Sequence, residues 1–457
     1  MRTFHYERSI LVNLRKKLNE RAIRGKPVRI VLIGAGKFGS MFLAQARRVP
    51  GVHVAGIADL NPTRARDSLA RAGWPAEQYA AISYGEAIRS GATFVTDDPM
   101  ALIASEPVDV VIDATGSPEA GIGHVLACCQ YHRHVVMVNV EADALVGPLL
   151  ARRATESEIV YSLAYGDQPA LICELVDWAR TAGFEVIAAG KGTKYLPVYH
   201  SSTPDTVWTH YGFSPEVVRQ GDFNPKMFNS FLDGTKSAIE MAAVANATGL
   251  TPAPEGLAFL PCGVDDLPRL LKPRAEGGAL AHRGQVEVVS SLERDGRPVY
   301  RDLRWGVYVT FAADSDYVRR CFHEYGLVSD DSGNYSAMYK PFHLIGLELN
   351  MSIASVGLLG EPTGAPAGFR ADVVAIAKRN LKAGETLDGE GGYTVYGRLM
   401  PAADSLAMGG FPIGLANGVK LKRGVGEGQP LLWEDVEVVV NEAVAFRREM
   451  EEIFRHG

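Results

Sequence analysis

One segment in the middle of the chain combines a lysine and two carboxylates in a spacing suited to carbonyl chemistry. Asp233-Gly-Thr-Lys236 precedes Glu240, which lies four residues after the lysine and therefore on the same face of an expected helix. The rest of that helix, which ends at Gly249, is mostly alanine, isoleucine, methionine and valine, so we expect its charges to be buried and either paired or functional. A lysine held by Asp233 and Glu240 would polarise or protonate a carbonyl oxygen during hydride transfer. The alternative is a structural ion pair.

Three further segments contain candidate site residues. Gly190-Lys191-Gly192-Thr193-Lys194 follows an apolar strand and, as a loop, would offer amides and ammonium groups to a substrate phosphate or carboxylate; the alternative is a solvated loop. His343 is either an acid–base residue of the pocket or a satisfied core histidine. Glu141 and Asp143 would hold a divalent cation or orient a substrate hydroxyl, although Asp143 is better suited to cap a helix. A metal requirement is not established by these residues.

A glycine motif predicts the cofactor that such chemistry needs. Gly34-Ala-Gly36-Lys37-Phe38-Gly39 comes directly after the apolar run 28–33 and before apolar residues at helical spacing. The three glycines would allow a tight turn, the approach of a pyrophosphate and close packing of helix on strand. We therefore expect a dinucleotide at this strand–helix junction, with Lys37 and Phe38 in the phosphate-binding turn.

The strand ends that follow carry polar residues. Asp59 closes the second apolar strand where an acidic residue meets the adenosine ribose, which favours NAD over NADP, although two arginines follow within a turn. Its alternative role is that of a turn aspartate. Later strands end at Thr115-Gly116 and at Asn139-Val-Glu141, and we assign Thr115, Gly116, Asn139 and Glu141 to the cofactor site because ligands collect at the carboxyl ends of parallel strands.

Alternating strands and helices up to about residue 166 predict an α/β fold with a Rossmann-like, doubly wound parallel sheet. We expect this NAD(P)-binding domain, with an N-terminal helical arm, to span residues 1–166. An α+β catalytic and dimerisation domain would follow over 167–362. A proline- and glycine-rich linker then separates a small β-rich domain over 370–440, and residues 441–457 form a C-terminal helix.

The composition excludes several functional classes. The chain has 457 residues and a net charge of -6, so it lacks the basic footprint of a nucleic-acid-binding protein. No run of apolar residues is long enough to span a membrane. The five cysteines show neither paired spacing nor a CxxC motif, which indicates reduced thiols in a cytoplasmic protein.

Together these motifs resemble the deoxyxylulose-phosphate-reductoisomerase-like family. The first domain is similar to the nucleotide domain of homoserine dehydrogenases, and the segment from Ala375-Ile-Ala-Lys378 to Leu387, with the later Gly-Glu-Gly-Gln-Pro-Leu, resembles a SAF domain. The resemblance covers about residues 10 to 440. It implies an NADPH-dependent homodimer that rearranges and reduces 1-deoxyxylulose 5-phosphate to 2-methylerythritol 4-phosphate for isoprenoid synthesis. The resemblance also implies that Lys191, Asp233, Lys236 and His343 line the pocket.

Three residues depart from these families. Asp59 stands where an NADPH enzyme would present small or basic residues, and Gln168 stands where a second acid is expected. Val140 follows Asn139, whereas homoserine dehydrogenases have a lysine there, which argues against homoserine as the substrate.

The sequence therefore predicts an NAD(P)-dependent oxidoreductase that acts on a small polyhydroxylated or phosphorylated carbonyl compound, with the reductoisomerase reaction as the named candidate. One alternative is an NAD-dependent catabolic dehydrogenase of a sugar acid, polyol or related hydroxy compound, which Asp59 supports. The other is a nucleotide-sensing protein without turnover.

Overall fold

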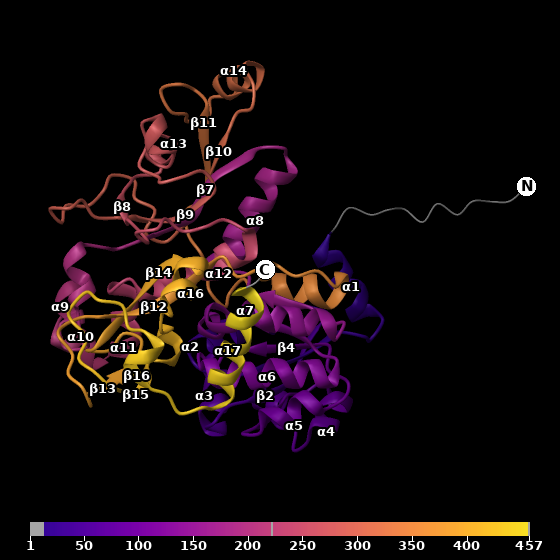
Figure 1. Cartoon of the computed structure of the whole chain (residues 1–457). Helices are drawn as coiled ribbons and strands as arrows, with labels where there is room; N and C mark the ends of the chain where they lie inside the picture. The colour runs from indigo at the N-terminus through magenta and orange to yellow at the C-terminus, as the bar shows by residue number, and fades with distance from the viewer. Residues whose placement is uncertain (1–12, 221–222, 456–457) are drawn as a thin grey trace, which may run out of the picture.

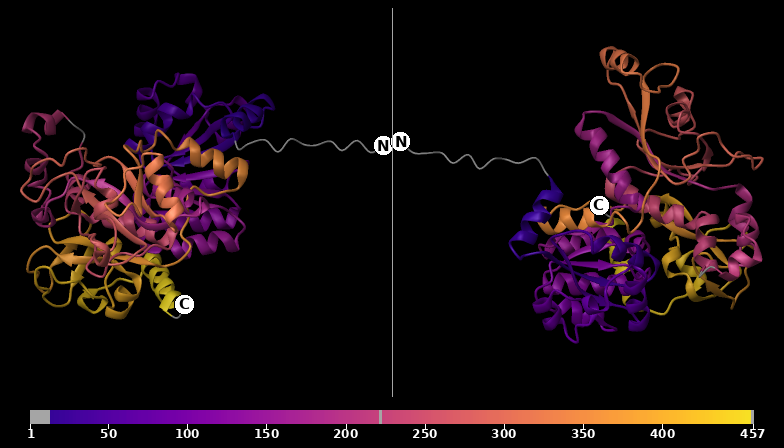
Figure 2. Two further views of the ribbon diagram at one scale, coloured as in Figure 1. Left: turned by 90° about the horizontal axis from the view of Figure 1, so that it is seen from above. Right: turned by 180° about the vertical axis from the view of Figure 1, so that it is seen from behind.

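The computed structural model describes residues 13–220 and 223–455. Figure 1 shows three lobes: the purple first domain at lower right, a magenta and orange second domain that reaches to the top, and the yellow C-terminal domain at lower left. The second domain projects above the other two, and Figure 2 shows this arm from above and from behind.

In the described residues the first domain contains a six-stranded parallel sheet with the order β3-β2-β1-β4-β5-β6. This order confirms the predicted doubly wound sheet and places ligands at the carboxyl ends of the strands. The strands are β1 (Val28–Ile33), β2 (Val52–Ala58), β3 (Phe94–Thr96), β4 (Val110–Asp113), β5 (His134–Met137) and β6 (Tyr161–Leu163). The helices are α1 (Leu14–Ile23), α2 (Lys37–Ala46), α3 (Pro62–Arg71), α4 (Tyr84–Ser90), α5 (Pro99–Ala104), α6 (Pro118–Tyr131) and α7 (Val140–Glu156).

The strand β1 is apolar throughout its buried part because helices cover both faces of the sheet. Val31 and Ile33 pack in one hydrophobic cluster, and Ile30 and Leu32 pack in another on the opposite face. The second cluster includes residues from 349–356, a segment that the sequence assigned to the catalytic domain. The chain thus returns to the first domain before the linker.

The second domain is built on a mixed sheet, which has the order β11-β10-β7-β9-β8 in the described chain. Its strands are β7 (Glu185–Thr193), β8 (Leu260–Pro261), β9 (Gln285–Ser290), β10 (Val307–Ala312) and β11 (Tyr335–Lys340). Its helices are α8 (Gln168–Thr181), α9 (Val207–Tyr211), α10 (Pro215–Gln220), α11 (Pro225–Leu232), α12 (Thr235–Thr248), α13 (Leu267–Leu270), α14 (Asp316–Glu324) and α15 (Asn350–Ala354), the last followed by a π-helical turn, Ser355–Leu359.

The prediction that Gly190-Lys191-Gly192 forms a loop is wrong, because these residues continue the strand β7. Two glycines make the continuation sterically feasible. A Cβ atom on Gly190 would lie 1.7 Å from the carbonyl oxygen of Glu287, and one on Gly192 would lie 1.9 Å from that of Leu303. The backbone of Glu287 in β9 and that of Leu303, before β10, therefore lie too close for any side chain at these two positions.

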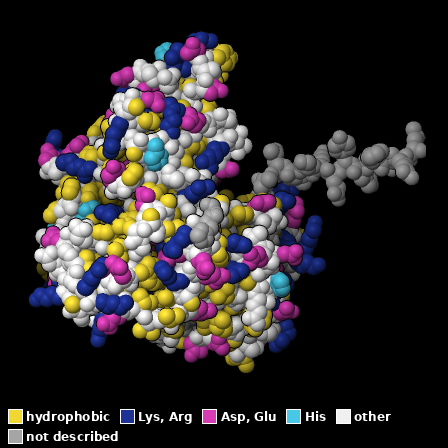
Figure 3. All heavy atoms as spheres, in the orientation of Figure 1, with side chains coloured by type: hydrophobic (Ala, Val, Ile, Leu, Met, Phe, Trp, Pro, Cys, Tyr) yellow, Lys and Arg dark blue, Asp and Glu magenta, His cyan; other side chains and the backbone are white. Residues whose placement is uncertain are grey.

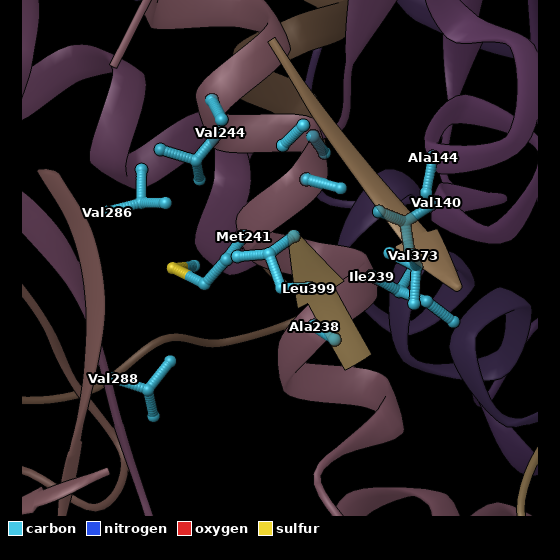
Figure 4. Packing of buried hydrophobic residues seen from close by; sticks show 14 of the residues in the cluster. Val140, Ala144, Ala238, Ile239, Met241, Val244, Val286, Val288, Val373 and Leu399 are labelled. Carbon is cyan, nitrogen blue, oxygen red and sulfur yellow. The ribbon is translucent and has the colours of Figure 1, made fainter. Parts of the chain in front are cut away.

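The predicted helix 235–248 is confirmed as α12, and it lies at the centre of the molecule. Figure 4 shows Met241 and Val244 of α12 near Val286 and Val288 of β9, while Ile239 lies near Val373. The same cluster includes residues of α7, so α12 contacts all three domains. Its position couples the second domain to both of the others.

The expected small β-rich unit and C-terminal helix are present. The unit contains β12 (Ala371–Ala377), β13 (Thr386–Asp388), β14 (Val395–Pro401), β15 (Asn417–Leu421), β16 (Val436–Glu437) and α16 (Ala402–Met408), and α17 (Glu442–Arg455) follows. Arg447 of α17 is fully buried, donates to the Leu145 carbonyl at 2.9 Å and pairs with Asp372 of β12. This arginine therefore joins α17 to both the first and the C-terminal domains.

The surface carries mixed charge. On the face drawn in Figure 3, acidic and basic side chains alternate without a large basic patch. Among residues 13–220 and 223–455, no helix has the length and apolar character needed to cross a membrane.

Candidate functional site

The glycine turn lies between the carboxyl end of β1 and the first turn of α2, as predicted. A Cβ atom on Gly34 would lie 2.6 Å from the Ala114 carbonyl oxygen, and one on Gly39 would lie 2.7 Å from the Gly34 carbonyl oxygen. Gly36 differs, because a Cβ atom there would have no neighbour within 4 Å in the described chain. Lys37 and Phe38 begin α2, where first-turn amides have no intrahelical acceptor. These residues fit a dinucleotide pyrophosphate, which would fill the open space beside Gly36.

Asp59 lies just beyond β2, and its carboxylate is almost fully buried. It accepts hydrogen bonds from the amides of Ala35 and Asn61 at 2.8 and 2.9 Å and pairs with the Arg64 guanidinium at 2.8 Å. Burial would raise the pKa of Asp59, but Arg64 and these amides outweigh burial and hold the pKa below its usual value. Asp59 is thus a fixed negative charge beside the glycine turn.

The carboxyl ends of β4 and β5 meet through a polar network. Asn139 caps α7, and its Nδ2 atom donates to Thr115 Oγ1 at 3.2 Å and to the Ser117 carbonyl at 2.7 Å. Thr115 Oγ1 donates in turn to Asp113 at 2.7 Å. A Cβ atom on Gly116, the next residue, would have no described atom within 4 Å. The predicted residues Thr115, Gly116 and Asn139 therefore lie together beside open space.

Lys236 pairs with Glu141, not with Glu240 or Asp233 as the sequence suggested. The contact joins the first turn of α12 to the first turn of α7. Asn139 caps helix α7, so the ion pair lies next to the polar network at the ends of β4 and β5. Lys236 is thereby brought to the edge of the sheet at which the cofactor is expected.

The other two carboxylates have different partners. Glu240 pairs with Lys191, and both side chains are buried. Asp233 pairs with Lys378 of the C-terminal domain at 2.8 Å and accepts from the Thr235 amide at 2.9 Å. The expected lysine–glutamate pair within one helix does not form, because side chains from β7, α7 and the C-terminal domain reach these charges.

His343 lies in the loop that follows β11 and is half-buried. Its Nδ1 atom is 2.7 Å from the Trp305 carbonyl oxygen. Its charge acts on Asp167, which caps α8 and whose charge acts on Lys236. The structure thus brings Lys236, Glu141, Glu240, Lys191 and His343 to one neighbourhood, whereas Asp233 pairs with Lys378 of the C-terminal domain.

Carboxylates dominate the electrostatics at Lys236. Burial by itself would lower the pKa of Lys236, but Glu141, Glu390, Glu240 and Asp167 outweigh it and hold that pKa above its usual value. Lys236 is therefore an ammonium ion at neutral pH. Burial and the charge of Glu240 raise the pKa of Asp167 to about 6. A fixed cation and a titrating carboxyl group thus lie in the same cluster.

A cleft of about 440 Å³ opens next to this cluster. Its walls come from Gly116 and Glu141 of the first domain, Ile239 of α12, and Glu390 and Ile413 of the C-terminal domain. Within the described parts of the chain, no group of three His, Cys, Asp or Glu side chains is arranged to hold a metal ion. In the described chain, Glu141 and Asp143 thus have no third side chain of these types with which to hold a cation.

Asp143 is instead fully buried, and its Oδ2 atom accepts from the Tyr161 hydroxyl at 2.8 Å. Burial raises the pKa of Asp143 to about 7. The helix cap is Asn139, so the expected capping role of Asp143 is wrong.

Sequence reasoning missed Glu390, which lies 154 positions after Lys236 in a different domain. Its signal was an acidic residue inside the glycine run Gly389-Glu390-Gly391-Gly392. Such a run often brings the backbone into close contact with another element.

Residues 166–349 match the model of the family described as "Oxidoreductase DRL, catalytic domain". The matched region carries Lys191, Lys236 and Glu240, and the expectation of an oxidoreductase is thereby confirmed. A comparison with curated proteins found no match.

Three solved structures are similar to parts of this chain. An oxidoreductase from Agrobacterium radiobacter, in complex with NAD⁺, L-tartaric acid and magnesium, is 17% identical with a TM-score of 0.27, covering 36% of this chain and 44% of that one. The myo-inositol dehydrogenase from Lactobacillus casei is 15% identical with a TM-score of 0.28, covering 40% and 50%. YvaA from Bacillus subtilis is 10% identical with a TM-score of 0.37, covering 73% and 89%. The chain thus spans about half the length of the first two structures.

Proposed function

We propose that the protein is an NAD-dependent dehydrogenase that interconverts a hydroxyl and a carbonyl group on a small polyhydroxylated substrate. The nicotinamide cofactor would accept or supply the hydride. Lys236 would stabilise the negative charge that develops on the substrate oxygen, because a preorganised cation at that position favours the transition state.

The contact between Lys236 and Glu141 carries this proposal. It links the charged cluster of the second domain to α7, the helix that Asn139 caps. Asn139 in turn donates a hydrogen bond to Thr115, the residue before Gly116. A nicotinamide ring bound at the ends of β4 and β5 would then face the ammonium group of Lys236.

Two observations favour NAD and a neutral, hydroxyl-rich substrate. The fixed negative charge of Asp59 would disfavour a 2′-phosphate on the adenosine ribose. The cleft is bordered by the carboxyl groups of Glu141, Asp388 and Glu390, which accept hydrogen bonds from hydroxyl groups and repel an anion.

The reductoisomerase reaction is the second candidate. One observation favours it: in the described chain, Lys194 and Arg304 have no carboxylate within ion-pairing distance. The charge of Arg304 acts on Lys194, so the two cations lie near each other. Together they could bind the phosphate of 1-deoxyxylulose 5-phosphate.

The experiment is a turnover screen that follows absorbance of the reduced cofactor. Polyols and neutral sugars with NAD⁺ or NADP⁺ form one arm, and 1-deoxyxylulose 5-phosphate with NADPH or NADH forms the other. We expect turnover in the first arm, with NAD⁺ preferred. Turnover only of the phosphorylated substrate would replace the dehydrogenase proposal with the reductoisomerase, and a variant with both Lys194 and Arg304 changed to Ala should then lose it.

A further inference from the structure

We propose that Glu390, which the C-terminal domain contributes, is the catalytic residue that takes up and returns the proton of the substrate hydroxyl group. This inference rests on the proposed dehydrogenase function and adds a residue from a third domain to its site. The C-terminal domain would then be part of the active site, in addition to any role as a separate binding module.

The cleft supplies the first support. Glu390 lines the same cavity as Gly116 and Glu141, which lie at the cofactor edge of the first domain. Pro412, Ile413 and Gly414 of the C-terminal domain line the same cavity. A substrate bound near Gly116 would therefore be enclosed by the C-terminal domain, with the carboxyl group of Glu390 among its neighbours.

The backbone around Glu390 is held in place from the second domain. Lys226 Nζ donates to the Asp388 carbonyl at 3.0 Å, and Asn229 Nδ2 donates to the Gly391 carbonyl at 2.9 Å. Lys378, which pairs with Asp233, donates to the Gly392 carbonyl at 2.8 Å. This assigns Asp233 a positioning role, because its charge fixes the lysine that holds the Glu390 loop.

Glycine at position 391 is required by this docking. A Cβ atom on Gly391 would lie 2.0 Å from the Lys226 carbonyl oxygen, and its φ of 65° also disfavours other residues. The glycine run therefore serves close packing against α11, and it leaves Glu390 as the side chain that reaches the cleft.

The charges that face Glu390 come from three elements. Burial, followed by the charge of Glu141 on α7, raises the pKa of Glu390, while Lys236 on α12 opposes this; Asp233 at the end of α11 raises it further. The result is a pKa of about 7. Lys236 remains charged at that pH, so Glu390 is better suited than Lys236 to exchange a proton near neutrality.

The proposed step balances as follows. During oxidation the C–H hydrogen leaves the substrate carbon with both bonding electrons and goes to the nicotinamide. The O–H proton passes to the Glu390 carboxylate, and the O–H bonding electrons form the new C=O bond. Lys236 stabilises the partial negative charge on that oxygen during the transfer. The proton then leaves Glu390 for water in the cleft, and reduction reverses these movements.

The test compares E390Q with E427Q, a matched control that changes an exposed glutamate of the same domain. We expect E390Q to lower kcat by about 100-fold or more, to lose the pH dependence near neutrality and to bind NADH as the wild type does. E427Q should resemble the wild type. A D167N variant is included because Asp167 also titrates near Lys236.

A second measurement does not need turnover. A water-soluble carbodiimide couples an amine to protonated carboxyl groups, and mass spectrometry gives the labelling of Glu390 from about pH 5 to about pH 9. We expect a midpoint near neutrality that rises in K236M and falls in E141Q. A midpoint near the usual glutamate value of about 4.3, or one that is insensitive to both variants, would overturn the proposal.

The outcomes separate this inference from the proposed function. E390Q within about threefold of wild type while K236M is inactive would reject Glu390 and leave the dehydrogenase in place. Loss of the pH dependence in D167N instead of E390Q would also reject Glu390 and assign the proton to Asp167. If no polyol or neutral sugar is turned over, the proposed function fails, and the labelling still decides whether Glu390 titrates as inferred.

Discussion

Replacement of Lys236 by Met should affect folding and catalysis through separable causes. The side chains of Lys236 and Glu141 are 16% and 15% exposed, so their ion pair is largely but not wholly removed from water. Removing one partner of a buried pair costs about 3–5 kcal/mol of unfolding free energy. Because some exposure remains, we expect the lower end of that range, about 3 kcal/mol.

The loss of unfolding free energy in K236M should depend on pH. Lys236 lowers the pKa values of Asp167 and Glu390, so its loss raises these pKa values further in the folded protein. When the pKa of a carboxyl group is higher in the folded than in the unfolded state, the protein loses stability as the pH rises through the folded-state pKa. K236M should therefore be more destabilised at about pH 8 than at about pH 5.5.

A second substitution distinguishes the two roles. The double variant K236M/E141Q removes the uncompensated carboxylate and should regain most of the lost stability, whereas turnover should stay about 100- to 1,000-fold below wild type. Urea unfolding and initial rates measure these effects, and K382M, at an exposed lysine, is the control. Recovery of turnover in the double variant would refute the role of Lys236 in the reaction.

Three further outcomes are expected. D143N should raise the thermal midpoint more at about pH 8 than at about pH 5.5, because the pKa of about 7 makes the buried Asp143 carboxyl group cost stability as it ionises; equal shifts by calorimetry would contradict this. R447M should cost about 3–5 kcal/mol in urea unfolding, because Asp372 would remain buried without its cation; a loss below about 1 kcal/mol would argue against this role. D59N should raise the ratio of NADPH to NADH affinity about tenfold by calorimetry, and an unchanged ratio would show that Asp59 does not select the cofactor.

Local patterns predicted the first domain well. The apolar run 28–33, the glycines after it and the helix that follows depend on neighbouring residues, so their places in the fold could be inferred from spacing alone. Asn139 was likewise expected at a strand end, and it lies two residues after β5. Residues at the carboxyl ends of parallel strands meet at one edge of the sheet, and this does not depend on the contacts of the other domains.

The partners of the buried charges could not be inferred in this way. Lys236 and Glu240 were expected to pair because they lie four residues apart on one helix, but long side chains on a central helix also reach neighbouring elements. Lys236 contacts a residue 95 positions earlier, and Glu240 contacts one 49 positions earlier. The Gly190-Lys191-Gly192 segment was mistaken for a loop because its glycines suggested a turn, whereas they permit close contact between strands.

The central claim, that a dinucleotide binds at the glycine turn, is tested most directly by calorimetric titration of NADH into wild type, G36A and G123A. Both glycines have an allowed backbone conformation and no described atom within 4 Å of an added Cβ atom, but only Gly36 faces the expected pyrophosphate. We predict that G36A weakens NADH binding about 10- to 100-fold, which corresponds to about 1.4–2.8 kcal/mol, and that G123A binds as the wild type does. Equal affinity of G36A and wild type, or no binding by the wild type, would contradict the account.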